Sequence, residues 1–259
     1  MHVEYHRVRQ DFTRSAKSYA LHADVQWAIL EQLLDLASLY IPENATVLDV
    51  GCGPGWSRDA MGKKAVGRRI VGVDFSEAMC EEAYKHGLEA VCASAEQLPF
   101  ESNSFDNVIS SLCAQWLTQP QLFVREIARV LKPGGYAAIA TLGPLTLYEL
   151  RNTFGLYQEE NRVMPFRNEK DWMYMARAEG LTVTHMHSSI WRYPYPSLTA
   201  LLRTLRNVGA TNKHPDRKRG LSGIELFAKV ECAYEESYAR PTGGIWASWQ
   251  PLTLILKKH

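Results

Sequence analysis

The chain has 259 residues, of which 46% are hydrophobic and 22% charged, and its formal net charge is +1. This length suits one α/β domain with additions, and we expect a single domain over 1–259. The near-neutral charge argues against a broad nucleic-acid footprint, so no nucleic-acid partner is expected. No run approaches the ~20 apolar residues of a membrane span, and the N-terminal stretch has no signal-peptide core. A cytoplasmic protein without a membrane partner is expected.

The cysteines indicate neither a disulfide framework nor a metal site. They are odd in number, form no CxxC pair and have no histidine at metal-ligand spacing. We interpret them as reduced thiols and expect no metal. They are Cys52, Cys80, Cys92, Cys113 and Cys232.

The first 42 residues predict an N-terminal helical segment, because apolar residues recur at helical spacing over 8–38. A helix placed before the first strand of an α/β sheet commonly crosses the mouth of the ligand site. By this analogy Tyr19, His22 and Gln26 are expected near the site, although a packing role suits each of them equally well.

A glycine-rich turn follows the first predicted strand, 46–50, which contains Asp49. Such turns let a ligand lie against bare backbone and the start of a helix. A dinucleotide fingerprint would need a small residue where Trp56 stands, and the turn has no lysine that would suggest a P-loop. The turn instead resembles motif I of the S-adenosylmethionine-dependent methyltransferases with a Rossmann-like fold. Its residues are Gly51, Cys52, Gly53, Pro54 and Gly55.

The second predicted strand, 69–74, ends in an acid. Asp74 follows Gly51 by the roughly twenty residues expected of a carboxylate that binds ribose hydroxyls. An alternative is a helix-capping role, since Ser76 marks the start of a helix.

After the third predicted strand, 88–92, the stretch S-A-E-Q-L-P-F at 94–100 resembles the D-A-E-x-L-P-F segment of the same methyltransferases. There the loop reaches the adenine, and the resemblance places Ala95 and Glu96 at the cofactor. Ser94 departs from the pattern and loses the charge-assisted hydrogen bond of an aspartate. An ordinary polar loop is the alternative.

The fourth strand, with its lead-in, is predicted at 104–112, followed by a helix at 121–131 and a fifth strand at 136–141. The L-K-P-G-G sequence at 131–135 should end the helix, with glycine as its C-cap. Ligands of open α/β sheets bind at the carboxyl ends of the strands. The expected wall residues are therefore Ser111, Leu112, Gln115 and Trp116.

Beyond residue 141 the pattern predicts helices at 144–157, 168–179, 198–207 and 224–239, a strand at 181–193 and a last strand at 243–257. We divide the chain into an N-terminal segment 1–42, a cofactor-binding core 43–141, a cap with strand six at 142–242 and the last strand within 243–259. The fold class is α/β: a Rossmann-like class I methyltransferase, with a seven-stranded, mostly parallel sheet, an N-terminal helix and a helical cap inserted around strands five to seven.

Four stretches resemble a narrower family, the malonyl-acyl-carrier-protein O-methyltransferases of biotin synthesis. They are Phe12…Tyr19 with H-A-D-V-Q at 22–26, S-L-C-A-Q-W at 111–116, T-L-G-P-L-T-L-Y-E-L-R at 141–151 and L-L-R-T-L-R-N-V-G-A-T-N at 201–212. The last two belong to the predicted cap, so they are more specific than the motifs shared by the superfamily.

The resemblance implies methyl transfer from S-adenosylmethionine to the free carboxylate of malonyl carried on acyl carrier protein. That carboxylate is already ionised at neutral pH, so no general base is needed. The implied cofactor-binding residues are Asp49, Gly51, Cys52, Gly53, Gly55, Asp74, Phe75, Met79, Ala95, Glu96, Leu112 and Gln115.

A buried substrate carboxylate needs a cation, and the arginine fork suits it. We expect Arg151 and Arg192 to contact it and Tyr19 to donate a hydrogen bond; alternatively, Arg151 pairs with Glu149. Acyl carrier proteins are acidic, so a basic stretch would dock the partner, although an ordinary solvated loop explains it almost as well. That stretch includes Arg203, Arg206, Arg217, Lys218 and Arg219.

Three alternatives stay open. The T-L-Y-E-L-R stretch also resembles a mitochondrial complex I assembly factor thought to hydroxylate arginine on a partner subunit. A methyltransferase for another small acid or a quinone precursor would carry the same core. A protein that binds the cofactor without turnover is the third alternative.

Overall fold

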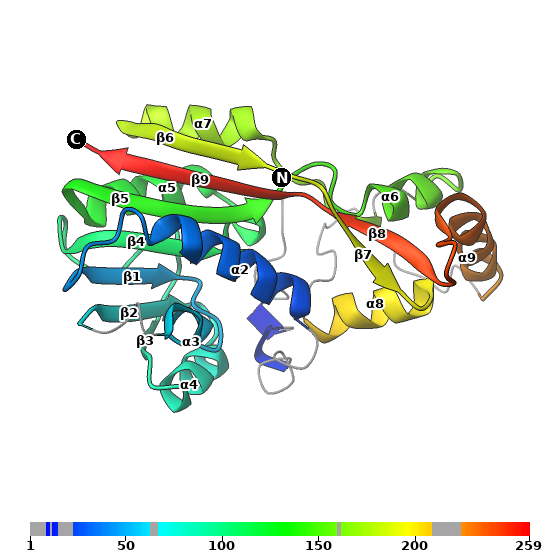
Figure 1. Cartoon of the computed structure of the whole chain (residues 1–259), viewed down its shortest axis with the longest axis horizontal. Helices are drawn as coiled ribbons and strands as arrows, with labels where there is room; N and C mark the ends of the chain where they lie inside the picture. Colours follow the sequence, from blue (N-terminus) through cyan, green and yellow to red (C-terminus); the bar gives the residue numbers. More distant parts are fainter. Residues whose placement is uncertain (1–8, 11, 15–22, 63–66, 160–161, 209–223) are drawn as a thin grey trace.

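A seven-stranded sheet forms the centre of the molecule (Figure 1). The computed structural model describes residues 9–10, 12–14, 23–62, 67–159, 162–208 and 224–259. The strand order is β3-β2-β1-β4-β5-β9-β6, and β9 is antiparallel to both β5 and β6. The predicted seven-stranded, mostly parallel sheet is therefore confirmed. Its strands are β1 (Thr46–Val50), β2 (Arg69–Asp74), β3 (Glu89–Cys92), β4 (Phe105–Ser111), β5 (Leu131–Leu142), β6 (Leu181–Ser188) and β9 (Pro251–Lys258).

Helices cover both faces of this sheet. On one face α2 buries Ile29 and Leu33, one helical turn apart, against β5 and its neighbours. On the other face α5 buries Phe123 and Ile127 in a second apolar cluster. The two clusters are the two sides of one core. The helices of the first face are α2 (Asp24–Ala37), α3 (Trp56–Met61) and α4 (Glu77–Lys85), and those of the second are α5 (Pro120–Val130) and α7 (Glu169–Ala178).

An extension lies beyond the carboxyl ends of the parallel strands (Figure 1). It consists of a two-stranded ribbon and three helices, and corresponds to most of the predicted cap. By contrast, α7 packs on β6 and α5 in the sheet layers, so it is not one of the cap helices. The elements of the extension are β7 (Trp191–Tyr195), β8 (Ile245–Trp249), α6 (Tyr148–Gly155), α8 (Leu198–Asn207) and α9 (Ile224–Tyr238).

Two predicted single strands are each divided into two. The predicted strand 181–193 breaks at 189–190, and the predicted strand 243–257 breaks at Gln250. Both breaks fall at the same level, because Ser188 pairs with Leu252 in the main sheet and Trp191 pairs with Trp249 in the ribbon. The antiparallel pair therefore leaves the sheet together and continues as β7 and β8.

Gln250 ties this bend to the start of the extension. Its carbonyl accepts a hydrogen bond from the Gly143 N–H (2.8 Å), and its Oε1 accepts one from the Leu145 N–H (2.8 Å). Its Nε2 donates to Ser188 Oγ (2.9 Å), while its backbone N–H donates to Thr146 Oγ1 (3.0 Å). Residues 143–147 are held as a turn by these bonds, which is why α6 begins later than the helix predicted from residue 144.

The L-K-P-G-G sequence does not cap a helix with glycine, and that prediction is wrong. Helix α5 ends at Val130, and Leu131 is already extended and pairs with Phe105 on β4. Gly134, with φ of +82°, lies in an irregularity of β5 before regular pairing resumes at Tyr136. The glycine serves the turn inside the strand, where a left-handed conformation is needed.

Residues 9–10 and 12–14 are helical, as predicted, but α2 itself starts at Asp24, because Ala23 has a non-helical backbone conformation. Tyr19 and His22 lie outside the described residues.

Candidate functional site

The glycine turn after β1 adopts backbone conformations that exclude most side chains. Gly51, Gly53 and Gly55 all have positive φ, at +74°, +52° and +87°. A Cβ on Gly51 would overlap Cys113, and one on Gly55 would lie 2.9 Å from the Ala83 backbone. A Cβ on Gly53 would meet nothing within 4 Å. Gly51 and Gly55 thus allow close packing of the turn, whereas Gly53 borders open space.

Asp74 ends β2 directly beside this turn. Its Oδ2 accepts a hydrogen bond from the Gly53 N–H (3.0 Å), and its Oδ1 accepts one from the Ser76 N–H (2.9 Å). The side chain is 6% exposed, and burial raises the pKa of its carboxyl to about 6. The carboxylate therefore joins the glycine turn to the start of α4 and has one oxygen on each.

A second buried carboxylate, Asp49, lies on β1. It is 4% exposed, and burial, followed by the charge of Asp74, raises its carboxyl pKa to about 7. Desolvation disfavours the charged form of an acid, and a like charge nearby adds to the effect. The site thus holds two acids, and none of the described residues that line it is a compensating cation.

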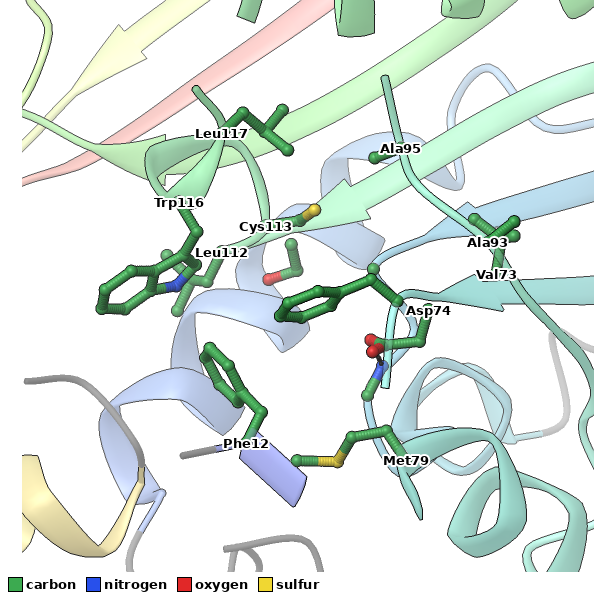
Figure 2. Close-up of a pocket in the computed structure, with 14 residues that line it drawn as sticks. Phe12, Val73, Asp74, Met79, Ala93, Ala95, Leu112, Cys113, Trp116 and Leu117 are labelled. Atoms are coloured by element: carbon green, nitrogen blue, oxygen red, sulfur yellow. Dashed lines mark hydrogen bonds between the residues drawn. The ribbon is translucent and has the colours of Figure 1, made fainter. Parts of the chain in front are cut away.

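Two adjacent cavities lie at this edge of the sheet, and together we call them the donor cavity; Figure 2 shows the residues that line one of them. They span ≈ 610 and ≈ 410 Å³, volumes that include space open to solvent, and share Gly51, Gly53, Ser111 and Leu112 as wall residues. They lie at the carboxyl ends of β1, β2 and β4, where the strand order reverses, as expected for ligand sites in such sheets.

Nine of the twelve predicted cofactor-binding residues line the donor cavity: Asp49, Gly51, Cys52, Gly53, Asp74, Phe75, Met79, Ala95 and Leu112. Ser111, Trp116 and Gln26 also line it, as the strand-end and helix arguments predict. The sequence arguments missed Phe12 and Cys113 as wall residues. Cys113 had a usable signal, because it lies two residues after Ser111, the last residue of β4.

The three other predicted residues do not line the donor cavity. Gly55 packs against α4. The Glu96 carboxylate accepts hydrogen bonds from the Gln119 N–H and the Thr118 hydroxyl, so it caps the start of α5 instead of entering the cavity. Gln115 donates to the Leu112 carbonyl (2.8 Å) and lines a neighbouring pocket.

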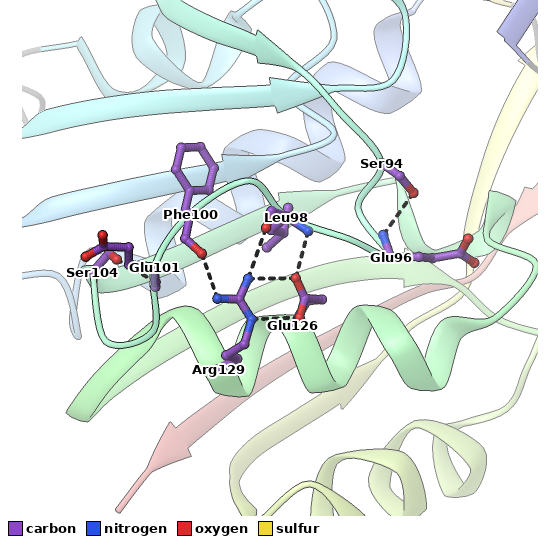
Figure 3. Close-up of polar contacts among 8 residues, drawn as sticks. All are labelled: Ser94, Glu96, Leu98, Phe100, Glu101, Ser104, Glu126 and Arg129. Atoms are coloured by element: carbon purple, nitrogen blue, oxygen red, sulfur yellow. Dashed lines mark hydrogen bonds and ion pairs between the residues drawn. The ribbon is translucent and has the colours of Figure 1, made fainter.

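The loop after β3 is anchored to α5 by an ion pair (Figure 3). Arg129 donates to the Leu98 and Phe100 carbonyls (3.0 and 2.6 Å), and Glu126 accepts from the Leu98 N–H (2.7 Å). The hydrogen bond from Arg129 holds the pKa of the Glu126 carboxyl below its usual value. These contacts hold the loop so that Ala95 faces the donor cavity.

The charge of the donor cavity indicates the kind of ligand it suits. No lysine, arginine or histidine is among the described residues that line it, while two buried acids are. A pyrophosphate would add negative charge to an already negative site, whereas a cationic ligand would favour ionisation of both acids. Hydroxyl donors would satisfy the free lone pairs of the Asp74 carboxylate.

The two arginines predicted to hold the substrate lie in the extension. Arg151 is half-buried and donates to the Pro144 and Thr146 carbonyls (2.9 and 3.1 Å), and burial lowers its pKa. The alternative pairing with Glu149 is not observed, because that buried carboxylate accepts hydrogen bonds from the N–H and hydroxyl of Ser248. Arg192 is exposed on β7.

Of the predicted docking residues, Arg203 and Arg206 are exposed and one turn apart on α8. Arg217, Lys218 and Arg219 lie outside the described residues, as does the predicted substrate contact Tyr19. In the part of the chain that the structure describes, no group of three or more His, Cys, Asp or Glu side chains could hold a metal ion. Within the same residues, no helix is long and apolar enough to cross a membrane.

Fold and donor cavity define a methyltransferase of the Rossmann-like class. Residues 48–139 match the family described as "Methyltransferase domain". A putative methyltransferase from Bacillus halodurans superposes with a TM-score of 0.62 at 22% identity, covering 88% of this chain and 98% of that chain. The YcgJ protein of Bacillus subtilis gives a TM-score of 0.63 at 17% identity, covering 89% and 98%. At these sequence identities, the two superpositions show that the fold is shared.

The chain belongs to the malonyl-[acyl-carrier protein] O-methyltransferase family. It is 34% identical to the member from Herminiimonas arsenicoxydans, covering 90% of this chain and 88% of that protein. Identity to the member from Erwinia pyrifoliae is 30%, covering 99% and 95%. The chain is also 32% identical to the biotin biosynthesis bifunctional protein BioHC of Cellvibrio japonicus over 99% of its length, and it spans about half (51%) of that longer protein.

Proposed function

We propose that this protein uses S-adenosylmethionine to methylate the free carboxylate of malonyl carried by acyl carrier protein, an early step of biotin synthesis in the cytoplasm. The observation that carries the proposal is the 34% identity to a malonyl-[acyl-carrier protein] O-methyltransferase over 90% of the chain. That span includes the extension as well as the core. A match confined to the core would support methyl transfer but would not indicate which molecule accepts the methyl group.

The charge and the wall residues of the donor cavity support this choice of methyl donor. Asp74 would accept hydrogen bonds from the ribose hydroxyls. Asp49 would provide negative charge near the positively charged sulfonium group of the ligand. Phe75, Met79 and Ala95 offer an apolar wall for the adenine. When bound, S-adenosylmethionine supplies an electrophilic methyl group on a sulfonium sulfur.

The chain's own contribution to the reaction is positioning. The substrate carboxylate, with a reference pKa of about 4, is ionised at neutral pH, so no side chain has to remove a proton. Catalysis would come from holding the attacking oxygen in line with the methyl carbon and from excluding water. Phe12 and Trp116, which meet edge to face at the cavity with ring centroids 5.6 Å apart, are suited to the second role.

Docking of an acidic carrier is proposed for α8. Arg203 and Arg206 form one exposed basic face, and the predicted stretch continues with Arg217, Lys218 and Arg219. Reversing Arg203 and Arg206 to glutamate should raise the KM for the carrier-linked substrate far more than the KM for a short malonyl thioester. A single charge reversal at Lys85, on α4 and remote from α8 (Figure 1), is the control for each single reversal, R203E and R206E. Equal effects on both substrates would contradict docking at α8.

One incubation tests the proposed function. Purified protein is mixed with S-adenosylmethionine and with malonyl-acyl carrier protein, free malonate or malonyl-CoA, and the products are weighed by mass spectrometry. A gain of one methyl group on the carrier-linked substrate supports the proposal. No gain on any of the three, with S-adenosylmethionine bound, would reject it in favour of a binding or assembly role.

A further inference from the structure

The segment between α6 and α7 packs against the wall of the donor cavity. Met164 is buried, and Phe12, Phe75, Trp116 and Phe166 pack against it. Three of these aromatic residues line the donor cavity. The segment around Met164 and Phe166 therefore reaches the site through tertiary packing.

A smaller pocket lies next to the donor cavity at the carboxyl end of β5, and we call it the β5 pocket. It spans ≈ 250 Å³, a volume that includes space open to solvent, and Thr141, Arg167 and Trp172 are among its wall residues. Leu117 lines both this pocket and the donor cavity, so the two spaces are neighbours. β5 adjoins β4, at the edge of the sheet where ligands of this fold bind.

Two wall residues of the β5 pocket carry hydrogen-bond donors for which the described part of the chain offers no acidic partner. Arg167 is half-buried and forms no ion pair with any described acid. Trp172 is 2% exposed, and its indole N–H has no acceptor among the residues that the structure describes. No aspartate or glutamate is among the described wall residues. Buried donors are normally paired, because an unpaired one costs about 1–3 kcal/mol, so the pocket suits an anion.

The two arginines singled out by sequence are placed less well for this task. The Arg151 guanidinium donates hydrogen bonds to two carbonyls of the adjacent turn, and Arg192 is exposed on the ribbon. Neither lines the donor cavity or the β5 pocket. Arg167 is the described arginine that lines the pocket adjoining the donor cavity.

We propose that the β5 pocket binds the carboxylate of the methyl acceptor through the Arg167 guanidinium and the Trp172 indole N–H. This inference rests on the proposed function for the nature of the acceptor. Because the attacking oxygen must keep a free lone pair for the methyl carbon, the two donors hold the other oxygen of the carboxylate. Arginine and indole N–H groups both donate without accepting, which suits a carboxylate and not a cation.

The test compares R167Q with R167K, W172F and the control R177Q. Arg177 is an exposed arginine on the same helix as Trp172, and it lines neither cavity. R167Q should raise the KM for a short malonyl thioester by more than about tenfold, with the Kd for S-adenosylmethionine unchanged. R167K should keep part of the affinity because it keeps the charge, and W172F should lose less than R167Q. R177Q should behave as wild type.

A binding measurement makes the assignment independent of turnover. Malonate is titrated by calorimetry into wild-type protein and R167Q, each saturated with S-adenosylhomocysteine, and the neutral dimethyl malonate is titrated in parallel. Weaker binding of malonate alone in R167Q supports the proposal. Equal malonate affinity in the two proteins, or loss of S-adenosylmethionine affinity in R167Q, would overturn it. Wild-type protein that methylates no malonyl substrate would instead overturn the proposed function, while the malonate titration still decides the role of Arg167.

Discussion

Replacing Asp49 by asparagine should stabilise the ligand-free protein while weakening S-adenosylmethionine binding. The carboxyl is buried and its pKa is raised to about 7 from 3.8, so the folded state disfavours the charged form. The free energy of unfolding therefore falls as pH rises from the carboxyl pKa of the unfolded state to that of the folded state. Above the folded-state pKa it falls no further. A rise of about three pKa units corresponds to a penalty of roughly 4 kcal/mol at high pH, of which about 2 kcal/mol develops between about pH 5.5 and 8.5.

The assay is urea unfolding of wild type and D49N at about pH 5.5 and 8.5, without ligand. D49N should gain stability over wild type, and the gain should be about 2 kcal/mol larger at the higher pH. The Kd for S-adenosylmethionine, measured at the higher pH, should rise in D49N because the ligand's positive charge loses its counter-charge. A stability difference independent of pH, or one that shrinks as pH rises, would refute the reasoning.

Three further outcomes follow from the site. D74A should raise the Kd for S-adenosylmethionine at least about tenfold, because ribose hydroxyls would lose a charged acceptor; an unchanged Kd by calorimetry would reject the ribose role. G51A should lower the Tm more than G53A, since both positions have a positive φ that strains an alanine but only the Gly51 Cβ would also overlap Cys113; equal Tm losses would contradict this. R129M should lower the Tm and increase hydrogen exchange in the loop after β3; unaltered exchange there would show that the loop does not depend on the ion pair.

The donor side of the site was predictable because its signals are local in sequence. Three alternate glycines after a strand determine a turn, and the spacing from Gly51 to Asp74 is set by one β-α-β unit whose dimensions vary little. Glu96 shows the limit of such reasoning. Its motif placed the loop correctly, but the side chain accepts hydrogen bonds from the Gln119 N–H and the Thr118 hydroxyl at the start of α5, which no local pattern reveals.

The acceptor side was less predictable because tertiary packing creates it. Arg167 belongs to no motif and follows no strand, and it reaches the β5 pocket only because Met164 and Phe166 pack on aromatic residues from elsewhere in the chain. The division of the two late strands at Gln250 was missed for a similar reason. Their alternating pattern continues across the bend, and the departure from the sheet depends on pairing between two distant segments.

The place of β9 in the sheet has a consequence for how the protein folds. β9 lies between β5 and β6, where Tyr136 pairs with Lys257 and Thr182 pairs with that same residue from the other side. Neither β5 nor β6 can complete its ladder until this late segment arrives, and contacts so distant in sequence form slowly. Until then, two strand edges stay open to pairing with other chains. During synthesis of this protein there should therefore be a stage in which the donor site can already form. At that stage β5 and β6 are not yet joined, because β9 has still to pair with both.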